Sequence, residues 1–325
     1  MNLAQTKFYI GPMSKNIVDT IIEVNNDAPN VFGFIPSRRQ VEFDGGYVNN
    51  WTTQAFSKYV NKQVTIQRDH GGPWQGKIKD FGFKSFSIDA ENFDIIHIDP
   101  WKLDRHFTFN VQYTIDYINY IDNINPNMLY EIGTEEAICA FSPKQLVVFL
   151  HRLQEMLPIN TFSRIKYAVI QSGVGLDVVN KKNIGKTSFE KLKQMISVCN
   201  DFGVMTKEHN GDYLSSDQIK RRFDLGLSAI NIAPEFGQIE TQCYLEEMTN
   251  QEIDKYYKIC YESNRWKKWV GKDFDPKNKI DLITACGHYV LSHPEFLDIK
   301  PNIDDKIVSA IKNKLYQLLE LLYGK

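Results

Sequence analysis

Residues 64–76, VTIQRDHGGPWQG, begin as a β-strand and end in a group of polar and glycine residues. Apolar and polar side chains alternate over the first four positions, which is the period-two pattern of a half-buried strand. An acid and a histidine, Asp69 and His70, follow at once, with two glycines and a proline behind them. The stretch therefore predicts a strand whose carboxyl end carries either an inert hydrogen-bonded corner or a metal ligand beside a proton donor.

Seven other apolar stretches with β-branched residues also predict strands, and helical patterns lie between them. The eight predicted strands are residues 31–35, 64–69, 94–99, 128–133, 167–172, 203–208, 228–233 and 282–287. Three of the helical patterns cover residues 109–121, 143–157 and 188–202. Eight alternations of strand and helix predict an α/β fold, the (β/α)8 TIM barrel, in preference to an open doubly wound sheet with a helical extension.

A chain of this length can form one large domain or two ordinary ones. We expect residues 1–325 to form a single barrel domain with a C-terminal helical extension from about residue 240. The last helical pattern, residues 304–325, would either complete the outer ring of helices or supply a subunit contact.

The composition excludes several classes of partner. The chain is 42% hydrophobic and 24% charged, with a formal net charge of -2 and scattered rather than clustered Lys and Arg residues, so nucleic acid is not an expected partner. Neither a signal peptide nor a long apolar run is evident, so we expect a cytoplasmic protein without a membrane partner. The five cysteines include no CxxC pair, which argues against a disulfide framework and a cysteine zinc site.

One face of several predicted strands is polar toward the carboxyl end. The polar residues are Gln67 with Asp69, His97 with Asp99, and Asn231 between two isoleucines. The outward face of a barrel strand packs on helices and must be apolar. We therefore expect these polar side chains to point into the barrel and toward its carboxyl-terminal mouth, where the active sites of such barrels lie.

Four histidines fall at or near different predicted strand ends: His70, His97, His209 and His288. A catalytic transition-metal site needs about three imidazole or carboxylate ligands and one position left open for substrate. If the four histidines converge on the mouth of the barrel, they could supply these metal ligands. The alternative is a satisfied polar network that only closes the top of the barrel.

Anion-binding candidates also lie at strand ends. The turns at Gly173 and Gly175 and the helix that opens after Ala233 expose backbone N–H groups that could hold a phosphate, although tight-turn geometry alone would explain the glycines. Arg38 and Arg39 are adjacent cations at the end of the first predicted strand, where they could bind a phosphate or carboxylate or simply lie at the surface.

Six segments, in order, resemble the tagatose-bisphosphate aldolase subunit family usually called non-catalytic. They are FGFIPSRRQVEFDGGYVNNWTTQAF, RDHGGPWQ, IIHID, YEIGTE, VIQSGVGLD and KEHNGDY, and they span about residues 31–240. The resemblance implies a (β/α)8 barrel related to class II, zinc-dependent ketose-bisphosphate aldolases. It thus implies a divalent metal, with zinc as the expected ion.

The resemblance also implies roles for single residues. Asp69 and His70 resemble the proton donor and zinc ligand at a strand end of class II aldolases, and His209 resembles a second ligand. Asn231 and the helix after it resemble the part that holds a ketose phosphate.

The remaining positions stay open. His97, Glu131, Glu135 and His288 compete for the third ligand position, and the two arginines stand where family members tend to have small polar residues. Glu135 and Glu208 are further candidate catalytic groups, and Gln67 and Glu235 further candidate substrate-binding residues.

Three functions are compatible with these residues. The leading hypothesis is a metal-dependent aldolase that acts on a phosphorylated or otherwise anionic sugar. The alternatives are a sugar epimerase or isomerase that uses the same metal site, and a non-catalytic subunit that stabilises a partner aldolase. The expected partner is a small sugar or sugar phosphate, with a homo-oligomer or an aldolase subunit as further possibilities.

Overall fold

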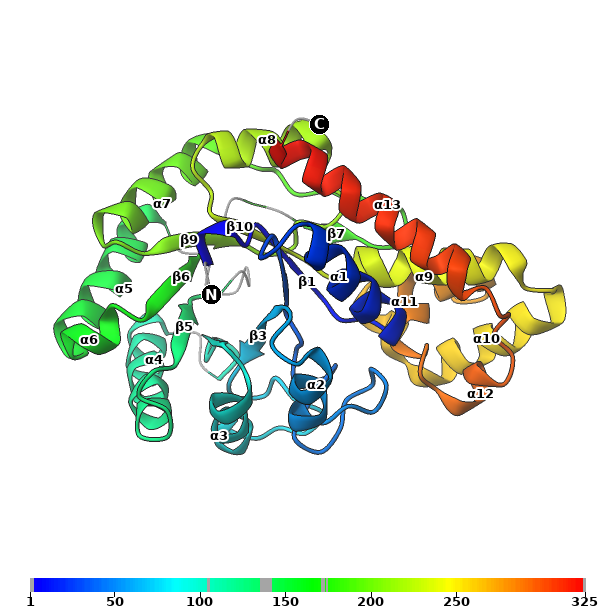
Figure 1. Ribbon diagram of the computed structural model, residues 1–325, viewed down its shortest axis with the longest axis horizontal. Helices are drawn as coiled ribbons and strands as arrows, with labels where there is room; N and C mark the ends of the chain where they lie inside the picture. The colour runs from blue at the N-terminus through cyan, green and yellow to red at the C-terminus, as the bar shows by residue number, and fades with distance from the viewer. Residues whose placement is uncertain (1–2, 104–105, 135–141, 171–172, 174, 324–325) are drawn as a thin grey trace.

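Eight parallel strands close into a barrel in the computed structural model, which describes all residues except 1–2, 104–105, 135–141, 171–172, 174 and 324–325 (Figure 1). The order around the barrel is β1-β10-β9-β6-β5-β4-β3-β2. The strands are β1 Phe8–Ile10, β2 Phe32–Phe34, β3 Thr65–Gly71, β4 Ile95–Ile98, β5 Leu129–Ile132, β6 Ile165–Val169, β9 Met205–Glu208 and β10 Ala229–Ile232. The predicted TIM barrel is thus confirmed.

Helices surround this barrel and extend beyond it on one side. Those that follow the strands are α1 Lys15–Asp27, α2 Thr53–Val60, α3 Phe83–Asn92, α4 Phe107–Asp122, α5 Pro143–Met156, α6 Ile159–Phe162, α7 Phe189–Asp201, α8 Ser216–Asp224 and α9 Pro234–Glu247. The C-terminal part contains α10 Asn250–Ser263, η3 Arg265–Lys268, α11 Lys279–Cys286, η4 Gly287–Tyr289, α12 Pro294–Leu297 and α13 Asp304–Tyr323. The short elements η1 Leu3–Gln5, β7 Leu176–Asp177 and β8 Lys182–Asn183 complete the described chain.

The three predicted helices within residues 109–202 are confirmed as α4, α5 and α7. Side chains cap two of them: Ser142 forms a capping box at the start of α5, and Ser188 accepts a hydrogen bond from the Lys191 N–H at the start of α7. These caps fix the point at which each helix begins, and the apolar periodicity then buries one face against the barrel.

One predicted strand is wrong, and the true eighth strand lies elsewhere. Residues 282–287 are the buried part of α11 and the start of η4, not a strand. Five consecutive residues of this helix are buried, so its sequence reads as one continuous apolar run, which periodicity cannot separate from a buried strand. The missing strand is β1, whose three residues Phe8–Ile10 are too short to give a periodic signal and pair with β2 and β10.

The last helix closes the outer ring, one of the two predicted alternatives. α13 packs against α1, α8 and α9, and in Figure 1 it crosses the top of the molecule as a single red helix. It therefore occupies the space between the helices that follow the last and the first barrel strands. In the same view, α10, α11 and α12 lie together to one side of the barrel.

The barrel separates two groups of buried side chains. The larger apolar core lies between strands and helices and includes Ile66, Ile96 and Ile230. Inside the barrel, Lys207 Nζ on β9 reaches across to Gln67 Oε1 on β3 at 2.5 Å, although these strands are not neighbours. Polar residues therefore do point inward, as the alternation along the strands predicts.

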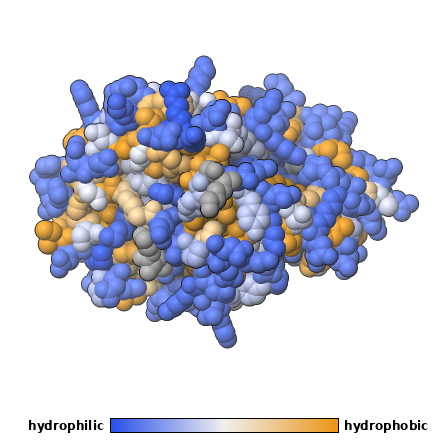
Figure 2. Space-filling model, turned by 45° about the horizontal axis from the view of Figure 1, so that its top comes forward, coloured by the Kyte–Doolittle hydropathy of each residue, from blue (hydrophilic) through white to orange (hydrophobic). Residues whose placement is uncertain are grey.

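The outer surface is of an ordinary globular kind. Figure 2 shows a face on which hydrophilic residues predominate, with exposed apolar side chains between them. None of the described helices is long and apolar enough to cross a membrane.

Candidate active site

β3 ends in a distortion that turns two consecutive side chains toward the mouth of the barrel. Its register against β4 shifts between Arg68 and Gly71, and His70 has a positive φ of 45°. In a regular strand, Asp69 and His70 would point to opposite faces; here both line the same pocket. Glycine is required at position 71, because a Cβ there would lie 2.7 Å from the carbonyl oxygen of His97.

Three histidines from three strands meet at this mouth. His70 and His97 are the second-last residues of β3 and β4, and His209 directly follows β9. Their ring centroids are 5.2 Å (70–97), 5.3 Å (70–209) and 5.1 Å (97–209) apart, and one ring nitrogen from each lies within 4.8 Å of the others. Three imidazoles in this arrangement can hold a transition metal and leave a position for substrate.

A ring nitrogen of each histidine is in contact with an oxygen atom of the protein. These contacts are His70 Nδ1 to Asp99 Oδ2 (2.6 Å), His97 Nε2 to the Gly133 carbonyl oxygen (2.8 Å) and His209 Nε2 to Glu131 Oε1 (2.7 Å). Metal-bound histidines usually make such contacts with their second nitrogen, which fixes the ring orientation. The donor set therefore fits a divalent metal.

Glu131, a predicted metal ligand, connects His209 to a buried lysine. Its second carboxylate oxygen lies 2.8 Å from Lys207 Nζ, and both residues are fully buried. Burial opposes ionisation of Glu131, but the charges of Lys207 and of the nearby histidines outweigh it and hold the pKa of Glu131 well below its usual value. Glu131 is therefore ionised, and it orients the His209 ring.

Lys207 lies at the centre of the barrel, below the three histidines. Its ammonium group is 3.4 Å from the ring centre of Tyr9 and 4.1 Å from that of Tyr167. Burial lowers the pKa of Lys207 to about 8, although Glu131 opposes the shift. Gln67, predicted to bind substrate, accepts a hydrogen bond from this lysine and belongs to the same interior network.

Asp69 lies beside the histidines on the pocket wall. Its carboxylate oxygens are 3.8 Å from His70 Nε2 and 3.9 Å from His209 Nδ1. The Oδ1 atom is buried and has no hydrogen-bond partner among the described residues. A buried acceptor without a partner is uncommon in native proteins and is often explained by a catalytic role or a bound ion.

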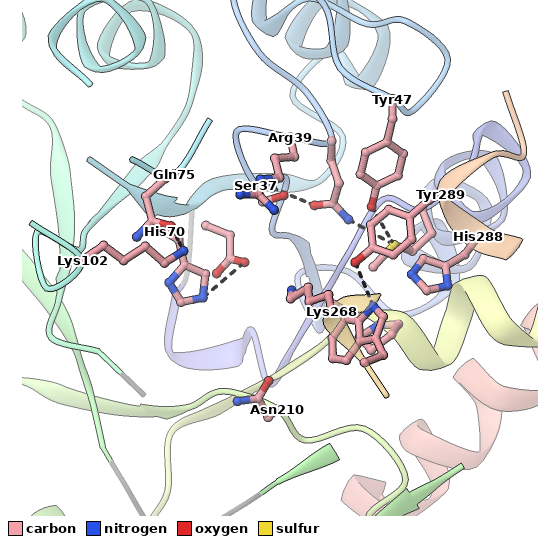
Figure 3. Close-up of a pocket in the computed structure, with 16 residues that line it drawn as sticks. Ser37, Arg39, Tyr47, His70, Gln75, Lys102, Asn210, Lys268, His288 and Tyr289 are labelled. Atoms are coloured by element: carbon pink, nitrogen blue, oxygen red, sulfur yellow. Dashed lines mark hydrogen bonds and ion pairs between the residues drawn. The ribbon is translucent and has the colours of Figure 1, made fainter. Parts of the chain in front are cut away.

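A pocket of about 170 Å³ opens from this site (Figure 3). Its described lining contains three cations, Arg39, Lys102 and Lys268, and one carboxylate, that of Asp69. Figure 3 shows His70 with Lys102 at one end of the pocket and a pair of aromatic rings at the other, with Lys268 between them. This charge balance favours an anionic ligand, and the volume favours a small one.

The two predicted arginines have different environments. Arg38 is 1% exposed, and its guanidinium group pairs with Glu42 at 2.5 Å and with Asp80 at 2.7 Å. Its charge is therefore neutralised inside the protein. Arg39 lines the pocket, where its Nε donates a long 3.4 Å hydrogen bond to the Gly76 carbonyl oxygen.

Three other predicted residues differ in their surroundings. Glu208 faces outward and forms a fully buried ion pair with Arg222 of α8. Glu235 pairs with Lys314 of α13 at 2.5 Å and so ties α9 to the last helix. Asn231 is buried, and neither amide atom has a hydrogen-bond partner among the described residues.

The amino terminus of α9 is occupied by the protein's own carboxylate. Asp212 Oδ1 accepts hydrogen bonds from two backbone N–H groups at the start of this helix, at 2.8 and 2.9 Å. An incoming phosphate would meet a carboxylate there instead of open N–H groups. Gly173 and Gly175 precede β7 and are not among the described residues that line the pocket, while Glu135 lies outside the described residues.

Sequence reasoning missed the C-terminal side of the pocket. Lys268, Trp269 and Tyr289 line it, and they come from a segment in which the sequence predicts only His288 as a candidate site residue. His288, a candidate metal ligand, lies instead at the end of the pocket opposite His70 (Figure 3). Lysine and aromatic residues in helical turns carry no motif, so only the tertiary structure brings them to the site.

Comparisons with known proteins show similarity of fold. No protein-family model matches the sequence, and no curated protein matches it. A solved structure of a probable tagatose 6 phosphate kinase from Sinorhizobium meliloti is 14% identical, with a TM-score of 0.75 over 97% of this chain and 100% of that chain. A fructuronate-tagaturonate epimerase from Cohnella laeviribosi is 10% identical (TM-score 0.60, 98% and 81%), and a fructose-bisphosphate aldolase from Campylobacter jejuni is 13% identical (TM-score 0.54, 91% and 90%).

Proposed function

We propose that this chain is a metal-dependent enzyme of the class II aldolase kind, which breaks or forms a carbon–carbon bond in a small anionic sugar. The observation that supports it most is the meeting of His70, His97 and His209 around one point, with Asp69 beside them. These three histidines would hold the ion, and zinc fits an all-imidazole donor set. The bound metal would supply Lewis-acid polarisation of the substrate carbonyl.

Asp69 is the proposed proton carrier. Its Oδ1 atom is buried on the pocket wall without a hydrogen-bond partner among the described residues, so it has capacity to accept a proton from substrate. In cleavage, the carboxylate would take the proton from the hydroxyl group that becomes the new carbonyl and return it to the carbon released from the broken bond. In condensation, the same transfers run in reverse.

The two alternative functions, an epimerase or isomerase and a non-catalytic subunit, differ in whether they need Asp69 and the metal. An epimerase or isomerase would use both to move a proton at a carbon next to the carbonyl, without net cleavage. A non-catalytic subunit would need neither. Asp69 Oδ1, which has no hydrogen-bond partner in the described part of the chain, favours catalysis, because a scaffold has no need to leave a buried acceptor unsatisfied.

Metal analysis of the purified protein tests the first half of the proposal. After reconstitution with zinc and removal of excess ion, we expect about one equivalent of bound metal, and its loss in the His70→Ala and His209→Ala variants. His151→Ala is the matched control. The His151 side chain is 58% exposed, and the structure pairs it with the surface residue Glu155 of the same helix. A folded wild-type protein that retains no metal would contradict the proposal.

A substrate screen tests the second half. The zinc-loaded protein is incubated with ketohexose phosphates and keto-hexuronates, and the products are separated and identified. Three-carbon or other shorter fragments support the aldolase, whereas a stereoisomer of the starting sugar supports the epimerase. A metal-loaded protein that turns over none of them would favour the non-catalytic role.

A further inference from the structure

The pocket has a second end whose chemistry differs from that of the histidine cluster. We call it the distal end and define it by Arg39, Tyr47, Lys268, His288 and Tyr289. Three of these residues come from η3 and η4, in the C-terminal part of the chain. Figure 3 shows Tyr47, Tyr289 and His288 grouped opposite His70, with Arg39 and Lys268 toward the middle of the pocket.

His288 is the most unusual residue of the distal end. It is 1% exposed, and neither of its ring nitrogens has a hydrogen-bond partner among the described residues. A buried polar group without a hydrogen-bond partner destabilises the folded protein. Such a side chain is explained if a ligand that lies in the pocket satisfies it.

The fold makes room for His288 at this position. A Cβ at Gly237 of α9 would lie 2.6 Å from the Cβ of His288, so only glycine there allows the close approach. The imidazole ring then lies against the ring of Tyr289, with 4.2 Å between centroids. Burial, helped by the charge of Lys268, lowers the pKa of His288 to about 3, so the ring is neutral and offers one donor and one acceptor.

The charged side chains that the structure describes in the lining of the distal end are positive. Arg39 and Lys268 both line it, and the described lining includes no carboxylate other than Asp69 at the opposite end. The Tyr289 hydroxyl accepts a hydrogen bond of 3.1 Å from Trp269 Nε1, which leaves its own hydrogen for a ligand. Together these groups offer two charges and two neutral donors.

We propose that the distal end binds the anionic group of the substrate, with Arg39 and Lys268 supplying charge and His288 donating a hydrogen bond to one of its oxygens. The inference rests on the proposed function, since the carbonyl end of the same molecule would lie at the histidine cluster. The ligand class is a short-chain sugar that carries a phosphate or carboxylate at the end remote from its carbonyl. The occupied amino terminus of α9 supports this position, because Asp212 already takes the N–H groups that could otherwise hold the anion.

Calorimetric titration of the intact protein tests the assignment. The probes are a ketohexose 6-phosphate, a keto-hexuronate and the neutral ketohexose. At least one charged sugar should bind about 10- to 100-fold more tightly than the neutral one, as charge-assisted hydrogen bonds would give. Tighter binding of the phosphate or of the uronate decides between the two anionic groups.

Two adjacent lysines on η3 provide a matched pair of variants. Lys268 lines the pocket, whereas Lys267 does not appear in its lining and lies over the ring of Trp266. Lys268→Gln and Arg39→Gln should each weaken binding of the charged sugar about tenfold and leave the neutral sugar unaffected. Lys267→Gln should change neither.

His288→Leu separates binding from folding. Loss of two unsatisfied nitrogens should keep or raise the thermal midpoint while affinity for the charged sugar falls. Equal affinity of the wild-type protein for charged and neutral sugars, or equal effects of Lys267→Gln and Lys268→Gln, would overturn the inference. Metal content, measured on the same samples, keeps its failure distinct from that of the proposed function, because none of these variants touches the three histidines.

Discussion

Asp69 lies between two histidines and the pocket. A substitution at this carboxylate therefore tests whether the site is catalytic or is only a polar network that closes the barrel. Asp69→Asn keeps the size of the side chain but removes its ability to take up a proton. The variant should keep its metal while kcat falls about 10²- to 10⁴-fold, with a smaller change in KM. The checks are metal analysis and steady-state kinetics on the sugar found in the screen.

Normal kcat in Asp69→Asn would mean that the acid is only a hydrogen-bond acceptor at the end of a strand. His70→Ala serves as the comparison, because it should lose metal and activity together. The pair of variants therefore distinguishes a residue that transfers protons from one that holds the ion.

His288 should also leave a signature in the pH dependence of folding. Its pKa is about 3 in the folded protein, against about 6.5 in an unfolded chain. Below about pH 6.5 the unfolded chain therefore binds a proton that the folded protein does not, so this residue lowers the free energy of unfolding as pH falls, by up to about 1.4 kcal/mol per pH unit. Urea unfolding between pH 6.5 and 4 should show a shallower acid loss in His288→Leu; parallel curves would rule this out.

A charged pair, Glu131 of β5 with Lys207 of β9, lies next to the histidine site, and we expect it to have separable effects on stability and on metal binding. Glu131→Gln leaves the Lys207 ammonium buried without its partner, which should cost about 3–5 kcal/mol in the free energy of unfolding. It also removes the carboxylate that orients His209, which should weaken metal binding about 10- to 100-fold.

The double variant Glu131→Gln/Lys207→Met is the control for that prediction. It should recover much of the stability in urea unfolding, because no charge is left unpaired in the barrel. Metal affinity should remain low. Recovery of both properties together would show that Glu131 acts on the metal site only through folding.

Strands and helices with clear periodicity could be predicted from the sequence, and distortions and short elements could not. The alternation in β3 correctly predicts that Asp69 faces inward, but the predicted strand ends at Asp69 and gives no orientation for His70. The register shift and the positive φ of His70 turn its ring toward the pocket, and neither leaves a mark in the hydrophobic pattern. β1 has three residues, too few to show a period, while α11 is buried almost all round and so reads as a strand.

For the candidate site, the sequence predicts that the three histidines meet but not which charged residues face the pocket. His70, His97 and His209 lie at or next to the carboxyl ends of strands, so the topology of a barrel is enough to bring them together. Arg38 and Glu208 are charged residues at strand ends as well, yet each lies in a buried ion pair with a neighbouring helix or loop. The sequence shows the charge but not its partner, so strand-end position alone does not tell which charged residues face the pocket and which lie in buried ion pairs.

At the scale of the whole molecule, α13 joins the end of the chain to its beginning. Four apolar side chains of this helix are buried, among them that of Leu315. Leu315→Ala should lower the free energy of unfolding by about 2–5 kcal/mol, the usual cost of a cavity in a packed core. Tyr316→Ala, at a neighbouring side chain that is 42% exposed, should cost much less in the same denaturation experiment; equal losses would mean that the helix is not held by its apolar face.

The pairing of β1 with β10 has a consequence for the order of events during synthesis. The first strand to leave the ribosome must wait for the last one, since Phe8 pairs with Ile230. Until then, the growing sheet has two open edges, which are ready templates for association with other chains. Contacts between such distant segments also form slowly. The stability of the finished barrel therefore does not protect these edges, and we expect the nascent protein to be most prone to aggregation before β10 has been made.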